Sequence, residues 1–245
     1  MKSLLAITDL TRMRHGRVCV AGYDKDGHCV RPVLPPPGIH ESSLYAFGKP
    51  VVFPFAVVEY DLLQPIIEPP HTEDWRYDPD SVRFFRLVVP KKRRDVLAMG
   101  LFESVAAIFE QSILTGPGFY VMAGQGPRSI GTIKPQHIFG TTFRAKEGGW
   151  DYRLRFVDDA GTIYVLPVTD LAWRYYCDRQ READELPHQI AVDLLEALKS
   201  AEVYLRVGLA RGWMKYPERC YLQITGVHTF PDYLQGKTFA DLRKS

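Results

Sequence analysis

The chain has 245 residues, 46% of them hydrophobic and 24% charged, and a formal net charge of +2. This composition is typical of a globular protein and excludes a largely disordered chain. The small net charge excludes a uniformly basic surface, so any contact with nucleic acid has to be made by a local patch. The longest apolar stretch, residues 51–58, contains Pro54 and is too short to span a bilayer. We therefore expect a cytoplasmic protein that does not contact membranes.

The first half of the chain predicts a succession of strands. Apolar runs and turn signals give strand candidates at residues 3–10, 17–23, 28–33, 49–63, 83–89 and 119–123. Asp26 and Gly27 indicate a hairpin turn between the second and third candidates, because Asp-Gly tolerates a positive φ. Residues 64–80, rich in proline, acidic and aromatic side chains, are expected to form a connection. Apolar residues at helical spacing predict a helix over residues 95–114.

The second half predicts three strands, a helical insert and two further strands. The strand candidates are residues 131–139, 150–157, 162–167, 201–210 and 219–227. Helices are predicted after Asp170, a capping residue, and from Pro187 onward. This order of elements is that of the oligonucleotide/oligosaccharide-binding (OB) fold. The first half has a similar run of strands, but its helix comes later.

Five segments resemble a known family. They are residues 16–22 (GRVCVAG), 27–33 (GHCVRPV), 166–173 (LPVTDLAW), 204–211 (YLRVGLAR) and 220–234 (CYLQITGVHTFPDYL). Together they are similar to the dual-OB-containing domain family of prokaryotes, over nearly the whole chain. The resemblance implies two OB-like domains in tandem and a nucleic-acid-related role, for which genome defence is one setting. It supplies no catalytic residues.

We accordingly predict a mainly β protein, β with inserted helices, formed by two tandem OB-like β-barrel domains. The N-terminal OB-like domain is expected to cover residues 1–126 and the C-terminal one residues 127–245. OB folds bind ligands on a strand face that is flanked by the loop between the first two strands and the loop between the last two. Basic and aromatic residues in these loops are therefore the first candidates for a binding site.

The turn between the first two predicted strands is basic. It contains Arg12, Arg14, His15 and Arg17, and Arg31 on the partner strand is expected to extend the same patch. As a group these residues are the preferred phosphate contacts, because the turn corresponds to a ligand-binding loop of an OB fold. The alternative for each single residue is an ordinary polar loop.

The densest run of positive charge is Lys91, Lys92, Arg93 and Arg94. Four adjacent cations suit the phosphates of a nucleic-acid backbone. The alternative is a solvated start of the helix expected over residues 95–114. Cations at the start of a helix face the positive end of its dipole, which is unfavourable and keeps the functional interpretation open beside the structural one.

The predicted loop between the last two strands interleaves cations with aromatic residues. Trp213 and Tyr216 are expected to stack on bases, while Arg211 and Lys215 hold phosphates. The residue types and the position of the loop in an OB fold agree with this function. The alternative is a loop whose Trp213 packs back on the core.

The sequence carries no recognisable catalytic or cofactor motif. It lacks the phosphate-binding GxxxxGK[ST] loop, a dinucleotide fingerprint, HExxH and GxSxG. The four cysteines, Cys19, Cys29, Cys177 and Cys220, match no zinc frame and are expected to be reduced structural thiols. We expect no cofactor and no metal, and a binding protein in preference to an enzyme.

Three hypotheses for the function follow. The first is binding of single-stranded or distorted DNA or RNA, with basic loops on the backbone and aromatic rings on the bases. The second is a protein-interaction adaptor in a multi-protein defence complex, which the near-neutral net charge and the proline-rich loops support. The third is an enzyme acting on nucleotides or nucleic acid through scattered residues.

Overall fold

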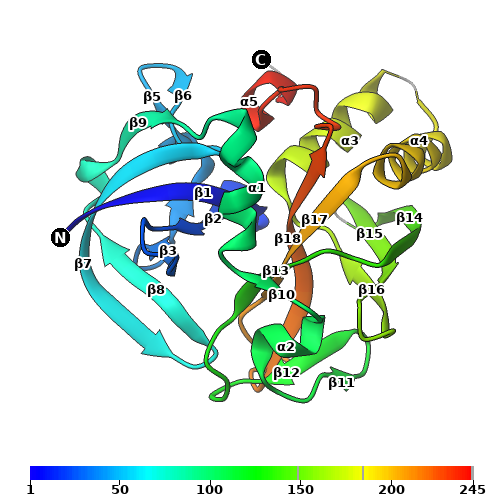
Figure 1. The fold of residues 1–245 in the computed structure, drawn as a ribbon, viewed down its shortest axis with the longest axis horizontal. Coiled ribbons are helices and arrows are strands. Elements are labelled where there is room, and N and C mark those ends of the chain that lie inside the picture. Colours follow the sequence, from blue (N-terminus) through cyan, green and yellow to red (C-terminus); the bar gives the residue numbers. More distant parts are fainter. Residues whose placement is uncertain (148, 184, 244–245) are drawn as a thin grey trace.

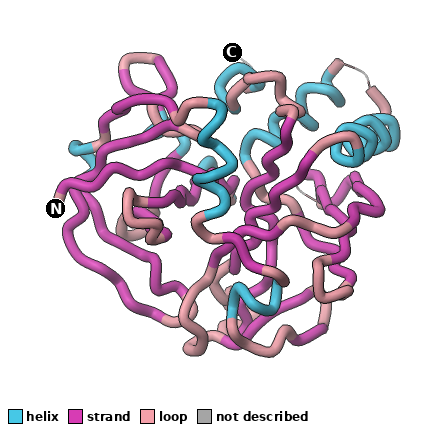
Figure 2. The backbone as a smooth tube through the Cα atoms, in the orientation of Figure 1, coloured by secondary structure: helices cyan, strands magenta, loops and turns pink. Residues whose placement is uncertain are grey.

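A computed structural model describes residues 1–147, 149–183 and 185–243. Figure 1 shows two strand-rich units side by side, the first formed by early strands and the second by later ones. In Figure 2 the helices are seen to be short and to lie mostly beside the sheets. Among the described residues, no helix is both long and apolar enough to cross a membrane.

The first unit is a curled seven-stranded sheet. Its strands are β1 (Lys2–Arg12), β2 (Arg17–Tyr23), β3 (Cys29–Val33), β4 (Ile39–His40), β7 (Ala56–Glu68), β8 (His71–Tyr77) and β9 (Arg83–Leu87). β1 pairs antiparallel with both β2 and β7, and β3 pairs parallel with β8. Since β7 also pairs with β8, the pairings run in a ring of five strands, β1-β2-β3-β8-β7. Such a ring is the Greek-key arrangement of an OB fold.

The second unit is divided between a six-stranded and a three-stranded sheet. Its main strands are β13 (Ile130–Ile133), β14 (His137–Lys146), β15 (Gly149–Val157), β16 (Ile163–Pro167), β17 (Glu202–Leu209) and β18 (Arg219–Phe230). β13 pairs with β17, β14 with β15, β15 with β16, and β17 with β18, all antiparallel. A parallel bridge between Val168 and Ile224 links the end of β16 to β18. The helical insert followed by two strands is confirmed, but the strand expected over residues 131–139 is divided between β13 and the start of β14, so four main strands precede the insert.

Helices and short elements complete the two units. The helices are α1 (Arg93–Ala98), α2 (Val105–Phe109), α3 (Leu171–Glu182), α4 (Pro187–Lys199) and α5 (Phe239–Leu242). The minor strands are β5 (Tyr45–Ala46), β6 (Lys49–Pro50), β10 (Leu101–Phe102), β11 (Leu114–Thr115) and β12 (Phe119–Met122). The 3-10 turns are η1 (Arg14–Gly16), η2 (Glu41–Leu44), η3 (Pro79–Ser81) and η4 (Pro90–Lys92). Asp170 caps α3 as expected, its carboxylate accepting from the backbone N–H groups of Ala172 and Trp173.

The helix expected over residues 95–114 is wrong. The segment forms α1, then β10 paired parallel with β13, then α2. Its apolar residues serve different cores, since Val96 packs with a cluster between the units and Ile108 with the core of the second unit. Gly100 separates the helices and lies against Tyr23, so closely that an added Cβ would be 1.9 Å from the tyrosine oxygen. Long-range packing therefore overrides the helical periodicity.

The connection expected over residues 64–80 is also wrong, because it forms most of the β7–β8 hairpin. In β8 three of the buried side chains are polar, namely His71, Glu73 and Asp74. A strand whose inward positions are polar lacks the alternation of apolar residues by which strands are recognised.

Elements from each side of the expected domain boundary pack into the other unit. β10 and β12, which precede the expected boundary at residues 126/127, pair with β13 and β18 of the second unit. Conversely, Leu171 of α3 and Phe239 of α5 are buried in the core of the first unit. α1 lies between the units in Figure 1, and its Leu97 packs in a cluster with residues of both. The division into domains 1–126 and 127–245 stays a prediction.

Candidate nucleic-acid interface

The loop between β17 and β18 presents aromatic side chains to solvent. Trp213 is 54% exposed and its ring stands edge-on to Tyr216, with ring centroids 5.7 Å apart. A hydrogen bond from the Tyr216 backbone N–H to the Trp213 carbonyl, 2.7 Å, closes the turn. At Gly212 an added Cβ would lie 2.1 Å from the carbonyl oxygen of Pro217, so this tight loop requires glycine there. The alternative in which Trp213 packs on the core does not occur.

Cations and rings alternate from this loop onto the neighbouring strands. The guanidinium of Arg219 lies 4.3 Å from the ring centroid of Tyr216 and 4.9 Å from that of Tyr120. The β12–β18 pairing sets Tyr120 opposite Tyr221, with ring centroids 5.6 Å apart. The Lys215 ammonium lies 5.5 Å from the Tyr216 ring. We call Tyr120, Trp213, Lys215, Tyr216, Arg219 and Tyr221 the aromatic–cation array.

The array has the composition of a surface that binds single strands. Exposed π-faces stack on bases, and the neighbouring cations interact with phosphates and with the rings themselves. Part of its charge is matched, since the Arg219 Nε donates to the carboxylate of Glu218 at 3.0 Å. Lys215 is exposed, and its pairing is with the Tyr216 ring.

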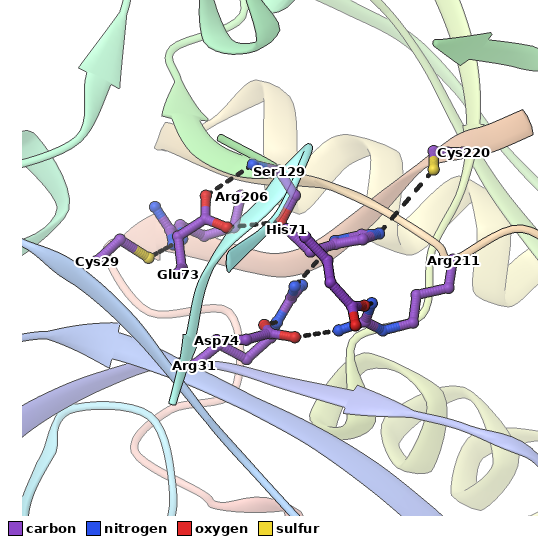
Figure 3. Close-up of polar contacts among 10 residues, drawn as sticks. Cys29, Arg31, His71, Glu73, Asp74, Ser129, Arg206, Arg211 and Cys220 are labelled. Carbon is purple, nitrogen blue, oxygen red and sulfur yellow. Dashed lines mark hydrogen bonds and ion pairs between the residues drawn. The ribbon is translucent and has the colours of Figure 1, made fainter. Parts of the chain in front are cut away.

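Arg211, expected on this surface, is instead an anchor between the two units. Its guanidinium donates to Asp74 (Figure 3). It also donates to Glu68 at 3.2 Å, and both carboxylates come from the β7–β8 hairpin of the first unit. Two carboxylates therefore match its charge, although half of its side chain is exposed. The residue fixes the base of the loop on which Trp213 stands.

Arg31 does not extend a surface patch, because it is 7% exposed. Its Nε donates to Asp74 at 2.5 Å, and its terminal nitrogen lies 2.9 Å from Nδ1 of His71 (Figure 3). Burial, together with the charges of Arg31 and Arg211, lowers the pKa of His71 to about 2. His71 is thus neutral and accepts the hydrogen bond from Arg31 through Nδ1. A buried guanidinium in this network has no access to a phosphate.

The basic turn between β1 and β2 is partly covered by the second unit. Arg12 forms an ion pair with Asp178 of α3 at 2.7 Å and lies over the ring of Tyr175, 5.2 Å from its centroid. Its charge is therefore used to join the units. The role of Arg12 as a phosphate contact stays a prediction, and Asp178 already pairs with its guanidinium.

The other residues of this turn stay at the surface. Arg14 and His15 are exposed, and His15 has a φ of 58° in the turn. Arg17 is half-buried and donates to the carbonyl oxygens of Arg14 and Pro37, at 3.1 and 3.2 Å. Among the described residues, none of these three side chains forms an ion pair within 4.0 Å.

The run from Lys91 to Arg94 divides between surface and junction. Lys91 and Lys92 are exposed, and Lys92 pairs with Asp95 at 2.7 Å. Arg93 packs over the Phe55 ring at 4.9 Å. Arg94 pairs with Glu202 at 2.6 Å and lies over the Phe230 ring at 4.1 Å. The two arginines therefore fasten α1 to the two units, and the two lysines face solvent.

Comparison with known proteins agrees with this architecture. A family model, the dual OB-containing domain, matches residues 10–227. The chain belongs to this family. No curated protein and no solved structure matches it significantly. The predicted fold class, mainly β with tandem OB-like units, is thereby confirmed, and a dual OB domain is in general a fold that binds nucleic acids or other oligomers.

In this dual-OB protein three members of the array escaped the sequence analysis. Arg219 and Tyr221 occupy alternate positions of β18, on the face opposite the buried Cys220 and Leu222. That alternation was a usable signal in the sequence. Tyr120 had none, because it joins the array through the pairing of β12 with β18.

The turn between β2 and β3 brings together three groups of metal-ligating type, Asp24, Asp26 and His28. The Asp24 carboxylate accepts from the backbone N–H groups of Asp26 and His28, both at 2.9 Å. Asp26 in turn pairs with Lys25 at 2.8 Å. The hydrogen bonds of an ordinary Asp-Gly turn account for this cluster.

Proposed function

We propose that this dual-OB protein binds single-stranded nucleic acid, DNA or RNA, at the aromatic–cation array. The observation that carries the proposal is the unbroken series of contacts that runs from Trp213 through Tyr216 and Arg219 to Tyr120. Stacking and phosphate contacts carry little base information, so binding is sequence-tolerant and weakens as salt rises. Arg14, His15, Arg17, Lys91 and Lys92 are secondary phosphate contacts in this proposal.

The test is fluorescence polarisation with labelled single-stranded DNA, single-stranded RNA and duplex, at low and moderate salt. Trp213→Ala is expected to weaken single-strand binding about tenfold, because one stacked base contributes about 1–3 kcal/mol. Lys215→Ala is expected to reduce the slope of log K against log salt by about one phosphate contact. Met214→Ala, fully exposed in the same loop, is the matched control and leaves binding unchanged.

Arg211 is left intact in this test. Its ion pairs with Asp74 and Glu68 hold the loop in place. Weaker binding by an Arg211→Ala variant could therefore come either from a lost contact with nucleic acid or from a change in the loop conformation. Absence of binding to all three probes at low salt contradicts the proposal. Equal weakening by Trp213→Ala and Met214→Ala contradicts the assignment to the array.

A second candidate function is that of a protein-interaction adaptor. β9 pairs with β7 and is exposed over its whole length, including Phe84, Phe85 and Leu87. An exposed apolar edge strand is a typical site for pairing with an extended segment of another protein. This candidate becomes the leading one if no nucleic acid binds at low salt. A genome-defence setting, implied by the family resemblance, is compatible with both candidates.

A further inference from the structure

A cleft of about 580 Å³ lies at the junction of the two units, away from the aromatic–cation array. The β2–β3 turn and β8 of the first unit form one side, and segments 99–102 and 127–130 form the other. Its volume is within the range of small-molecule sites, which is about 300–1,000 Å³. The array and the residues that line the cleft have no member in common.

The apolar lining of the cleft is aromatic and partly exposed. Trp75 of β8 and Phe102 of β10 both line it and are both half-buried. Met99, 45% exposed, lies beside them at the end of α1. A partly exposed aromatic ring is a group on which a flat ring system can stack.

The cationic groups of the residues that line the cleft are matched by carboxylates outside its lining. The N-terminal ammonium of Met1 pairs with Asp61 at 2.5 Å. Arg128 lies over the Phe102 ring at 4.9 Å, but its guanidinium pairs with Glu110 at 2.8 Å and donates to the Ile108 carbonyl at 2.9 Å. Asp24 and Glu73 also line the cleft. Because Glu110 already pairs with Arg128, the carboxylates of Asp24 and Glu73 determine which ligands the cleft can bind.

Glu73 is a buried hydrogen-bond acceptor whose carboxylate is held in place by Ser129. It is 7% exposed, and its two oxygens accept from the backbone N–H of Ser129 at 2.7 Å and from its hydroxyl at 2.9 Å (Figure 3). Among the described residues no cation forms an ion pair with it within 4.0 Å. An ionised carboxylate has about four acceptor positions, so the contacts with Ser129 leave about two for a ligand that donates.

We infer that this cleft binds a nucleobase that carries an exocyclic amine. The flat ring stacks on Trp75 or Phe102, and the amine donates to Glu73. Ligands that present only carbonyl oxygens to Glu73 are rejected, because two acceptors face each other. The same base chemistry is found in a free nucleoside and in a single strand. The inference does not depend on nucleic-acid binding at the array.

Isothermal titration of the full chain with adenosine and with purine riboside tests the inference. Purine riboside differs from adenosine only in lacking the exocyclic amine, and adenosine is expected to bind at least tenfold more tightly. Met99→Trp fills the cleft from an exposed position and is expected to weaken adenosine binding at least tenfold. Val192→Trp, on the exposed side of α4, is the matched control and binds adenosine like the wild type.

A short oligoadenylate distinguishes the two sources of the base. If Met99→Trp weakens oligoadenylate binding in a Trp213→Ala background, the cleft takes a base from a strand. If it weakens adenosine binding and leaves the oligoadenylate unaffected, the cleft takes a free nucleoside. No saturable adenosine binding, equal affinity for adenosine and purine riboside, or unchanged binding by Met99→Trp overturns the inference. Because Trp213→Ala removes no residue of the cleft, failure at the array leaves the adenosine result intact.

Discussion

Replacement of Arg206 by methionine is expected to destabilise the protein strongly. Arg206 of β17 is completely buried, and its Nε donates to Asp9 of β1 at 2.8 Å, so the ion pair crosses from one unit to the other. The guanidinium also donates to Tyr23 and, at 2.9 Å, to Thr132. Methionine keeps most of the apolar stem and leaves the Asp9 carboxylate buried without its cation.

The expected cost is about 3–5 kcal/mol in the free energy of unfolding, the usual result of removing one partner of a buried pair. The matched control is Arg94→Met. Arg94 also pairs with a carboxylate, but its side chain is 47% exposed, so its replacement is expected to cost about 0–1 kcal/mol. Urea unfolding followed by tryptophan fluorescence measures both values.

A second variant separates the cost of leaving the Asp9 carboxylate without its cation from the cost of lost packing around Arg206. Adding Asp9→Asn to Arg206→Met removes the uncompensated charge and keeps an acceptor for the hydroxyl of Thr225, which donates to Asp9 at 2.5 Å. The double variant is expected to recover about 1 kcal/mol or more relative to Arg206→Met. A loss in Arg206→Met similar to that in Arg94→Met refutes this reasoning, and so does a double variant less stable than the single one.

Three further predictions concern the stability of the fold. Burial lowers the pKa of His228 to about 4, below its value of about 6.5 in the unfolded chain. The contribution of the neutral imidazole to the free energy of unfolding is therefore fully present above pH 6.5 and is lost as the pH falls toward 4. Between pH 7 and 4.5 the free energy of unfolding of His228→Gln is expected to fall by about 2–3 kcal/mol less than that of the wild type in urea titrations. Gly22→Ala, whose Cβ would lie 2.5 Å from the carbonyl oxygen of Ala6, is expected to cost about 1–3 kcal/mol, whereas Gly140→Ala meets nothing within 4 Å and is neutral in thermal unfolding. Phe239→Ala is expected to cost about 3–5 kcal/mol in urea unfolding, because this completely buried ring closes the first core.

Most strands of both units could be predicted because these strands follow short-range rules. Turn residues such as Asp26 and Gly27 mark hairpins, and alternating side chains mark strands with one buried face. The rules failed at the β7–β8 hairpin, where the inward face is polar, and over residues 95–114, where two cores share the apolar residues. In both places the environment of a residue depends on distant segments.

The candidate interface was predicted in part for a related reason. Trp213 and Tyr216 could be recognised because the loop between the last two strands of an OB fold is a ligand-binding loop. The exposure of Trp213 in that loop does not depend on a distant segment of the chain. Arg31 and Arg211 were assigned to the surface, but both bind Asp74, which lies 43 and 137 residues away in the sequence. Nothing local marks a cation that has such a partner.

By itself the sequence determined most of the strands, the helical insert and the loop that carries the exposed Trp213. Only the tertiary structure decided which cations face solvent and which join the units. It also brought β8 and segments 99–102 and 127–130 together around the cleft. The physical reason is that strand formation follows local alternation, whereas a charge is buried only where a distant partner offsets its desolvation.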